Sequence, residues 1–338
     1  TMAADTILLS MQGISKTFPG VQALDNVDFS LHRGEIHALL GENGAGKSTL
    51  IKVLTGVERQ NAGVIRLEGQ EIQAKTPQHA QTLGITTVYQ EVNLCPNLSV
   101  AENILLGREP HRLGGIDWRK MNARAGEIMA WLDMDIDVKQ SLGMYPVAVQ
   151  QMVAISRALE ISAKVLILDE PTSSLATHET EKLFAVMRKL KQEGMGIIFI
   201  THFLDQVYAI SDRITVLRNG RLVGAYTTAD LPRVELVARM IGRDLTELEE
   251  MDKFKQAGGA HKDAAPALQA RDYGRIGAIA PFDLDLHAGE VVGLAGLLGS
   301  GRTELASLLF GAEKPDSGAL TVAQQPVAHH SPLNAIRL

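Results

Sequence analysis

Short apolar runs alternate with amphipathic stretches along most of the chain. Residues 35–41 (EIHALLG), 164–170 (KVLILDE) and 196–202 (GIIFITH) are apolar almost throughout and end in Gly or in polar residues. A strand that is apolar on both faces is typical of a parallel sheet covered by helices on both sides. The pattern therefore predicts three central strands of a parallel sheet.

Two segments beside these strands have helical spacing. Residues 48–56 place Leu50, Val53 and Leu54 at helical intervals and stop at a glycine. Residues 179–194 carry four apolar side chains on one helical face between two of the predicted strands. Strands that alternate with helices predict an α/β fold.

The coarse pattern also divides the chain into regions. Residues 91–160 are helical in pattern and rich in Met and Leu, which predicts a helical subdomain inside a first domain at 1–245. Residues 246–266 are polar, charged and rich in Gly and Ala, so we interpret them as a linker. The alternative for the first half of this stretch is an additional helix of the first domain.

The chain repeats itself at an offset of 255 residues. Residues 33–56 align without a gap on residues 288–311, and five glycines meet five glycines. The same offset places Phe18 on Tyr273. A repeat of this kind marks a duplicated structural unit. We therefore expect a second unit at 267–338 that contains only the opening part of the fold, as in a truncated two-unit protein.

Composition excludes several classes of protein. The chain has 338 residues and a net charge of −6, which argues against binding of nucleic acid. No apolar run approaches the roughly 20 residues that a bilayer span requires, and the first residues lack the basic region of a signal peptide. Cys95 is the only cysteine, so an intrachain disulfide is impossible and a reducing cytosol is expected.

The clearest chemical signal is a phosphate loop, GENGAGKST, which follows a predicted strand and opens a predicted helix. Its glycines allow backbone N–H groups to surround a phosphate, and the helix N-terminus adds positive potential. Lys47 is expected to bridge the β- and γ-phosphates, and the Ser48 hydroxyl to bind Mg²⁺. The alternative is a glycine-rich surface turn. The expected nucleotide-binding residues of the loop are Gly41, Glu42, Asn43, Gly44, Ala45, Gly46, Lys47, Ser48 and Thr49.

Polar residues end three further apolar runs, at the strand ends where open α/β sheets bind ligands. Asp169 is expected to bind Mg²⁺, and Glu170 to take a proton from the attacking water. His202 could contact a γ-phosphate, and Gln90 could reach Mg²⁺ or the water. Taken singly, His202 and Gln90 would more often be structural residues at strand ends.

The second unit contains an altered phosphate loop, VGLAGLLGSGRTEL, at residues 292–305. Arg302 stands where such a loop needs Lys, although the glycines and the following Thr303 are kept. A guanidinium is wider than an ammonium and cannot occupy the loop in the same way. We therefore expect this second loop to be degenerate.

Taken in order, the loop, Gln90, the DEPT stretch that begins at Asp169, and His202 resemble the ATPase unit of ABC transporters. The resemblance implies an α/β P-loop NTPase core with an antiparallel β subdomain and a helical subdomain, and an aromatic residue at Phe18 that stacks on adenine. The tandem arrangement with Arg302 is similar to the ATP-binding subunits of bacterial monosaccharide importers, of the ribose, galactose and xylose type and closest to the galactofuranose type.

This resemblance implies an ATPase that uses ATP and Mg²⁺ at the cytoplasmic face of the bacterial inner membrane. Its partners would be integral-membrane permease subunits and, through them, a periplasmic sugar-binding protein. Residues 91–118 are expected to contact the membrane subunit, with no nucleic acid involved. Two other classes remain open: a non-hydrolysing regulatory module, and a soluble ABC ATPase outside transport.

The family also closes each ATP between one phosphate loop and a Leu-Ser-Gly-Gly-Gln stretch of a second ATPase unit. Residues 145–149 (YPVAV) stand at that place here, and Pro146 offers neither hydroxyl nor N–H. Ala176 replaces an Asp that the family usually has. Pro146 and Arg302 would fall in one composite site, so the intact loop would need a stretch from beyond Leu338. The chain alone is therefore expected to be a poor ATPase.

Overall fold

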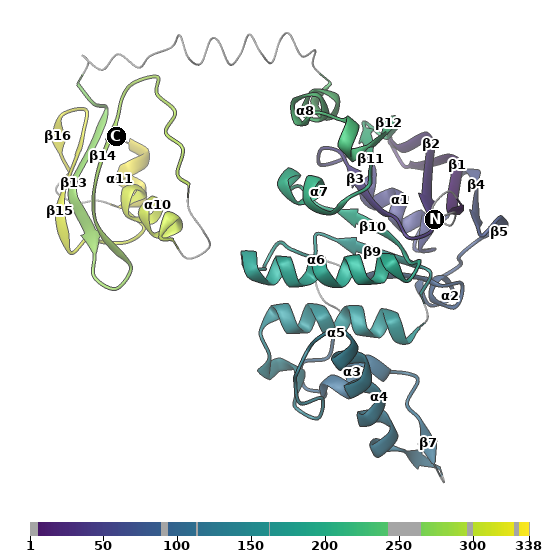
Figure 1. The fold of residues 1–338 in the computed structure, drawn as a ribbon. Coiled ribbons are helices and arrows are strands. Elements are labelled where there is room, and N and C mark those ends of the chain that lie inside the picture. The colour runs from purple at the N-terminus through teal and green to yellow at the C-terminus, as the bar shows by residue number, and fades with distance from the viewer. Residues whose placement is uncertain are drawn as a thin grey trace. The chain divides into compact units, whose positions relative to one another are not determined.

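The computed structural model divides the chain into two compact units, Thr1–Leu245 and Thr246–Leu338 (Figure 1). Each unit is considered by itself. No helix in the part of the chain that the structure describes is both long enough and apolar enough to cross a bilayer. The structure describes residues 6–88, 94–112, 114–161, 163–242, 265–295, 300–327 and 331–337.

A six-stranded sheet forms the centre of the first unit, in the order β12-β11-β3-β10-β9-β6. All neighbours are parallel except β12, which runs antiparallel to β11. Every residue of β3 and β10 is buried, so the three predicted central strands are confirmed. The strands are β3 (Ile36–Leu40), β6 (Ile85–Val88), β9 (Val165–Asp169), β10 (Gly196–Ile200), β11 (Arg213–Arg218) and β12 (Arg221–Thr227).

Alternate residues of the central strands pack on opposite faces of this sheet. Leu166 and Phe199 belong to a core shared with the helical subdomain, whereas Ile167 and Ile198 belong to a core shared with α1. The two predicted helices are confirmed as α1 (Lys47–Leu54) and α6 (Thr177–Gln192). These two helices pack on opposite faces of the sheet. Helix α2 (Pro77–Thr82) adds Ala80 to the core of α1, whereas α7 (Leu204–Ile210) and α8 (Arg233–Ile241) form a third core with β3 and β11.

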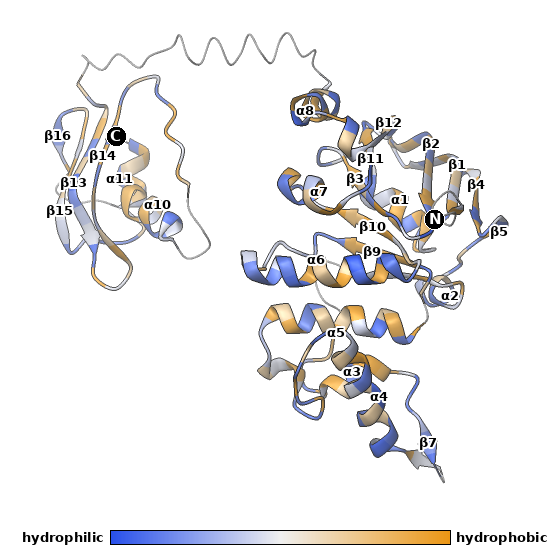
Figure 2. Cartoon of the chain, viewed as in Figure 1, coloured by the Kyte–Doolittle hydropathy of each residue, from blue (hydrophilic) through white to orange (hydrophobic). Residues whose placement is uncertain are grey.

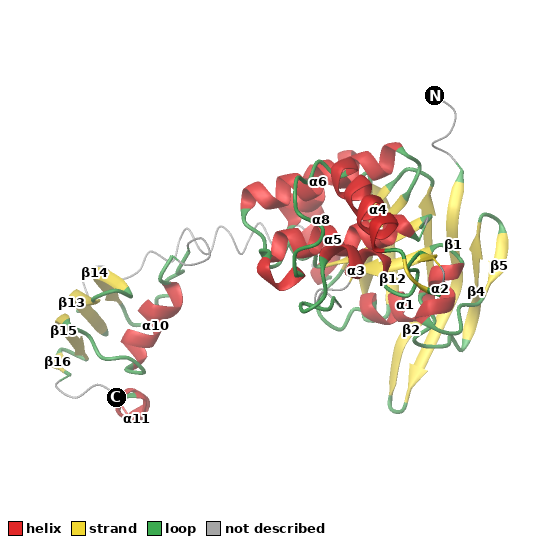
Figure 3. Cartoon of the chain, turned by 90° about the horizontal axis from the view of Figure 1, so that it is seen from below, coloured by secondary structure: helices red, strands yellow, loops and turns green. Residues whose placement is uncertain are grey.

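A second, antiparallel sheet of order β2-β1-β4-β5 packs against α1 through the same core. Figure 3 shows its strands β1, β2, β4 and β5 gathered on one side of the unit, with α4, α5 and α6 on the other. The expected antiparallel β subdomain is therefore present. Its strands are β1 (Ile7–Phe18), β2 (Val21–His32), β4 (Ala62–Leu67) and β5 (Gln70–Ile72).

The described part of the region predicted as a helical subdomain contains three α-helices and a small hairpin, β7–β8, which the sequence pattern did not predict. The helices turn apolar residues inward and polar residues outward, visible as alternating colours along α5 and α6 (Figure 2). The elements are α3 (Val100–Leu105), β7 (His111–Arg112), β8 (Gly115–Ile116), α4 (Trp118–Trp131), a 3₁₀ turn at Leu142–Met144 and α5 (Val147–Glu160).

The described part of the second unit contains an antiparallel sheet of order β14-β13-β15-β16 and the helices α10 and α11. Its buried core is small, made of Ala270, Tyr273, Leu308 and Leu320. At an offset of 255, β15 and α11 match β4 and α2 residue for residue. The elements are β13 (Leu268–Arg275), β14 (Ile279–Leu286), α10 (Arg302–Phe310), β15 (Ser317–Val322), β16 (Gln325–Pro326) and α11 (Pro332–Arg337).

The strand register corrects the predicted repeat at one point. Tyr273 pairs with Phe282 in the second unit, and the corresponding pair in the first unit is Ile14 with Val27. Tyr273 is therefore the counterpart of Ile14, and the prediction that it aligns with Phe18 is wrong.

The alignment of Tyr273 with Phe18 fails because the hairpin tips of the two units differ in length. In the first unit the pair Lys16–Leu24 encloses seven residues, whereas in the second unit the equivalent pair Arg275–Ile279 encloses three. Four residues are thus absent from the second tip, among them any counterpart of Phe18. A deletion at a tip leaves the hydrophobic periodicity of both strands intact, so the sequence pattern did not reveal it.

Candidate functional site

The loop between β3 and α1 is held in a shape that only glycine adopts easily. Gly41, Gly44 and Gly46 have φ angles of 151°, 83° and 104°. A Cβ atom on Gly41 would lie 2.3 Å from the Leu217 carbonyl oxygen, and one on Gly46 would lie 2.9 Å from the Ala23 oxygen. A Cβ on Gly44 would meet nothing within 4 Å. The loop thus packs tightly behind Gly41 and Gly46 and is open at Gly44.

Lys47, the first residue of α1, folds back over this loop. Its Nζ donates to the carbonyl oxygens of Gly41 at 2.6 Å and Glu42 at 3.0 Å. Burial lowers the pKa of Lys47, and the nearby carboxylates of Glu170 and Asp169 oppose that shift. No side chain caps the start of α1, so its first N–H groups are free to bind an anion.

Two carboxylates face the ammonium from the end of β9. Burial raises the pKa of Asp169, and repulsion from Glu170 adds to the shift, while Lys47 opposes it. Glu170 has a φ of 49°, which is uncommon for a residue with a side chain, and its N–H donates to the Ile200 oxygen at 2.9 Å. Backbone strain of this kind concentrates at functional sites.

His202 follows the neighbouring strand β10 and lies beside the same carboxylate. Its Nδ1 is 3.3 Å from Glu170 Oε1, and 59% of its side chain is exposed. The ring also packs against Phe203, with the centroids 4.0 Å apart. The structure therefore brings Lys47, the adjacent pair Asp169 and Glu170, and His202 together at one edge of the sheet, from three separate places in the sequence.

The sequence did not predict a hydrogen-bonded link between the loops that carry these residues. Gln206 Oε1 accepts from the hydroxyl of Thr172 at 2.6 Å and from that of Thr201 at 3.3 Å. Thr172 follows Glu170 closely in the chain, and Thr201 precedes His202. Gln206 thus connects the two loops that carry the carboxylates and the imidazole. Its position four residues after His202, at the start of a helix, is the only sequence signal for it.

The loop borders a hollow of about 420 Å³, called here the phosphate-loop hollow. One wall is the tip of the β1–β2 hairpin, and another is the β11–β12 turn with Asn219 and Gly220. The sequence predicted Phe18 on this hairpin but neither Val21 nor the β11–β12 turn. The residues that line the hollow are Val21, Gln22, Ala23, Asn43, Gly44, Ala45, Gly46, Lys47, Ser48, Thr49, Asp169, Glu170, Ile200, Asn219 and Gly220.

A second hollow of about 740 Å³ lies on the other side of Lys47 and Glu170 and includes His202. Its remaining wall is apolar and comes from Leu204 and the helix α8. Lys47 and Glu170 therefore line both spaces. The predicted residues Gly41 and Glu42 belong to this second hollow.

Three other predicted features are Gln90, Phe18 and the second phosphate loop with Arg302. Gln90 lies outside the described residues, as do residues 296–299 of the second loop. Phe18 lies at the hairpin tip paired with Val21, which lines the hollow, although Phe18 itself does not. Arg302 begins α10 and is exposed, after Gly301 with a φ of 87°. The second helix therefore begins as α1 does, with an arginine in place of Lys47.

The stretch at 145–149 forms the start of α5. Pro146 occupies the N-cap position, and no side chain caps the helix there. Pro146 and Val147 are exposed. Because proline has no hydroxyl and no N–H, this helix start lacks the side-chain donors expected of a phosphate-binding stretch.

The donor set of the hollow suits a hard divalent cation. The Ser48 hydroxyl and the Asp169 carboxylate supply oxygen ligands of the kind that Mg²⁺ takes. Within the described ranges, no group of three or more His, Cys, Asp or Glu residues could hold a metal alone. Mg²⁺ commonly binds through one or two protein oxygens together with substrate phosphates, so this sparse set fits.

These features define a P-loop nucleotide-binding unit, and comparison with known proteins gives the family. The sequence pattern of the ABC transporter family matches residues 24–173 and 279–337, and the chain belongs to that family. The two matched segments begin 255 residues apart, at the offset of the internal repeat. The resemblance to ABC transporter ATPases is therefore confirmed.

Among curated relatives, the galactofuranose transporter ATP-binding protein YtfR of Escherichia coli (strain K12) is 56% identical over 328 residues, covering 97% of this chain and 65% of that protein. The fructose import ATP-binding protein FruK of Bifidobacterium longum is 50% identical, covering 98% of this chain and 64% of that protein. The chain thus spans about 65% of the length of the curated relatives that it matches.

Solved structures confirm the predicted fold class. A nucleotide-free ATP-binding cassette of an ABC transporter superposes with a TM-score of 0.59 at 27% identity, covering 65% of this chain and 91% of that chain. The ADP conformation of another such cassette gives a TM-score of 0.61 at 25% identity, covering 72% of this chain and 98% of that chain.

Proposed function

We propose that the first unit binds ATP in the phosphate-loop hollow and hydrolyses it. The observation that carries this proposal is the position of Lys47, whose ammonium sits within the loop opposite Asp169 and Glu170. One ammonium, free helical N–H groups and an open side at Gly44 suit a polyphosphate. The β- and γ-phosphates would replace the two carbonyl partners of Lys47.

The two carboxylates have different roles in this proposal. Ser48 and Asp169 would hold Mg²⁺ against the phosphates, and Gln90, which lies outside the described residues, would contribute as a further ligand or as a water contact. Mg²⁺ supplies charge neutralisation of the phosphate oxygens. Glu170 would accept the proton of the attacking water, and its contact with His202 at 3.3 Å would keep the imidazole beside the terminal phosphate.

Phe18 is proposed as the platform for the adenine base. The hairpin tip that carries it also supplies Val21, Gln22 and Ala23 to the wall of the hollow. An aromatic ring at this tip is the apolar surface that a base needs for stacking. The domain limits proposed for this function are 1–245 for the first ATPase domain, 246–266 for a linker and 267–338 for the start of a second, degenerate one.

We infer that hydrolysis powers import of a monosaccharide. Curated relatives at 46–56% identity are named as ATP-binding proteins of galactofuranose, fructose and ribose import. The protein would act at the cytoplasmic face of the bacterial inner membrane. Its partners would be permease subunits, a periplasmic sugar-binding protein and a second ATPase unit. The names of these relatives do not favour the regulatory or non-transport alternatives.

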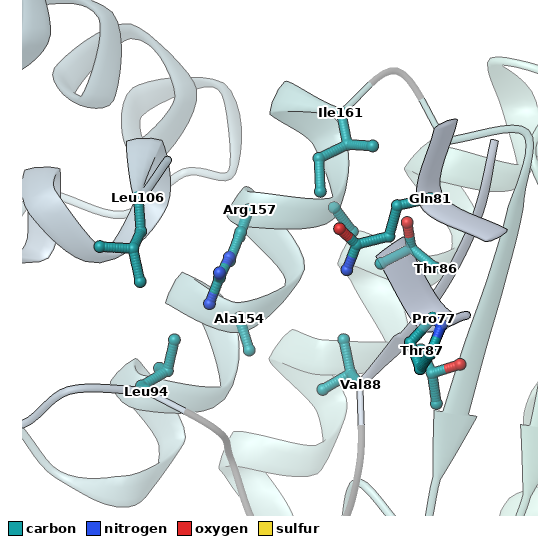
Figure 4. A pocket seen from close by; sticks show the side chains of 11 residues that line it. Pro77, Gln81, Thr86, Thr87, Val88, Leu94, Leu106, Ala154, Arg157 and Ile161 are labelled. Carbon is teal, nitrogen blue, oxygen red and sulfur yellow. The ribbon is translucent and has the colours of Figure 1, made fainter. Parts of the chain in front are cut away.

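A hollow of about 380 Å³ in the first unit is the proposed contact for the permease (Figure 4). Leu94 and Leu106 lie on one side of it and Pro77 and Gln81 on the other, with α5 between them. Leu94 is partly buried, and Cys95 beside it is exposed. Cys95 therefore suits cross-linking to a permease, as expected for residues 91–118.

Substitution Glu170→Gln tests hydrolysis. The amide keeps the shape of the side chain and removes the base, so ATP binding should persist while turnover falls about 10²–10⁴-fold. Hydrolysis and sugar uptake are measured in vesicles that contain the assembled transporter. Glu71→Gln, on the exposed strand β5, is the control for loss of one carboxylate. Unchanged turnover in Glu170→Gln would place the base elsewhere.

A further inference from the structure

We propose that Lys16 is a positioning residue that holds the Phe18 ring for base binding, and that this base platform exists in the first unit only. The proposal rests on the proposed binding of ATP in the first unit and specifies how the base would be recognised there. It comes from the contacts of Lys16 and from the different hairpin tips of the two units.

Lys16 joins the hairpin to the loop that follows α1. Its Nζ lies 2.8 Å from Glu58 Oε2 and donates to the Arg59 oxygen at 2.9 Å. The same Nζ stands 4.8 Å from the centroid of the Phe18 ring. Only 12% of the Lys16 side chain is exposed. The ammonium is thus fixed by two oxygen partners and presents its charge to one face of the ring.

The ring gains from such support because the tip beyond Thr17, whose N–H donates to Asn61 Oδ1 at 2.7 Å, is largely exposed. Val21, the strand partner of Phe18, is 62% exposed, and Gly20 turns the chain with a φ of 80°. Ordering a flexible aromatic on binding costs conformational entropy, which a preorganised ring avoids. With the cation on one face, the opposite face of Phe18 is the one left to receive a base.

The second unit provides an internal comparison. Its Arg275 is the register counterpart of Lys16, and it forms an ion pair with Glu313, which stands 255 residues after Glu58. Both units therefore keep an ion pair, called here the hairpin tie, between the first strand of the hairpin and the loop after the helix. Only the first unit places an aromatic residue beyond the hairpin tie, since the second tip is four residues shorter. The hairpin tie belongs to the fold, and its contact with an aromatic ring is the feature specific to the first unit.

The proposal predicts that loss of the Lys16 charge weakens binding of the base and leaves binding of the phosphates unchanged. In Lys16→Met, the preference of the protein for Mg–ATP over Mg–tripolyphosphate should fall about two- to fivefold, the factor that an exposed cation–π contact is worth. Tripolyphosphate affinity should stay unchanged. Lys16→Arg, which keeps the charge and the ion pair, should restore the preference. Both dissociation constants are measured by titration calorimetry.

Arg275→Met is the matched control, because it breaks the equivalent ion pair where no aromatic residue is present. It should leave the preference for ATP unchanged. Equal weakening of ATP and tripolyphosphate in Lys16→Met would show a purely structural role and overturn the inference, as would an unchanged preference. If the unaltered protein binds neither ligand, the proposed ATP site itself fails, a result distinct from either of these.

Discussion

At the scale of single residues, His37 shows how burial fixes the charge of a side chain inside the central sheet. It lies on β3 and is fully buried, with Nε2 2.7 Å from the Thr215 hydroxyl. Burial lowers the pKa of His37 to about 3, and the positive charges of Arg213 and His32 add to the shift. Glu35 faces its Nδ1 at 3.5 Å. The imidazole is therefore neutral at physiological pH.

This burial predicts a defined loss of stability in acid. The unfolded chain takes up the proton of His37 near pH 6.5, whereas the folded chain resists it until about pH 3. The free energy of unfolding should therefore fall as pH drops through that window, by at most about 1.4 kcal/mol per pH unit from this group. In His37→Gln, the free energy of unfolding, measured with urea at several pH values, should fall less steeply as the pH drops from 6.5 to about 3. The exposed control His178→Gln should keep the original dependence on pH. The same dependence in His37→Gln would contradict this interpretation.

The residues of the site differ in how well the sequence predicts them. Lys47 and its glycines belong to a local motif, so their chemistry was predictable from nine consecutive residues. Val21 and Asn219 reach the same hollow from distant hairpins, and only sheet packing brings them there. Gln206 carries no motif, because its role depends on two hydroxyl groups from the loops that follow β9 and β10.

At the scale of elements, the β1–β2 hairpin distinguishes two units that otherwise share their plan. The repeat predicts β15 and α11 from counterparts of equal length, and α10 from α1, which begins at the equivalent residue and is one residue shorter. The hairpin tip differs by four residues, a change that strand periodicity does not record. The length of the tip therefore could not be predicted from the hydrophobic pattern of the sequence.

The tip can be exchanged between units. Replacement of residues 17–22 by the Ile-Gly of positions 276–277 keeps Ala23 and the closing pair Lys16–Leu24, so the sheet should still form. We expect the preference for ATP over tripolyphosphate to fall by about tenfold, since base stacking is worth about 1–3 kcal/mol. Competition titrations measure it. A variant that folds and keeps the full preference would exclude the tip from base recognition.

At the scale of the whole molecule, the two units have very different cores. The first unit has three large hydrophobic clusters, whereas the hydrophobic cluster in the described part of the second has four buried residues. Residues 291–295 correspond to the buried strand β3 but form no strand, and Val291 is 96% exposed. Small cores give little stability, so the second unit should be the weaker one.

Calorimetry should then resolve two unfolding transitions, the lower from the second unit. Leu308→Ala should shift only the lower transition, because removing a buried leucine costs about 2–5 kcal/mol. Val53→Ala, at the equivalent buried position of α1, should shift only the upper one. A single transition that moves in both variants would mean that the two units unfold together.

The most direct test of the account compares Lys47 and Arg302, which begin equivalent helices in the two units. Mg–ATP is titrated into the unaltered protein, Lys47→Ala and Arg302→Ala. Loss of a desolvated charged contact costs roughly 1.5–3 kcal/mol, so Lys47→Ala should weaken binding at least about tenfold. Arg302→Ala should change affinity at the first site by less than about twofold. Equal losses in both variants would contradict the assignment of ATP binding to the first unit.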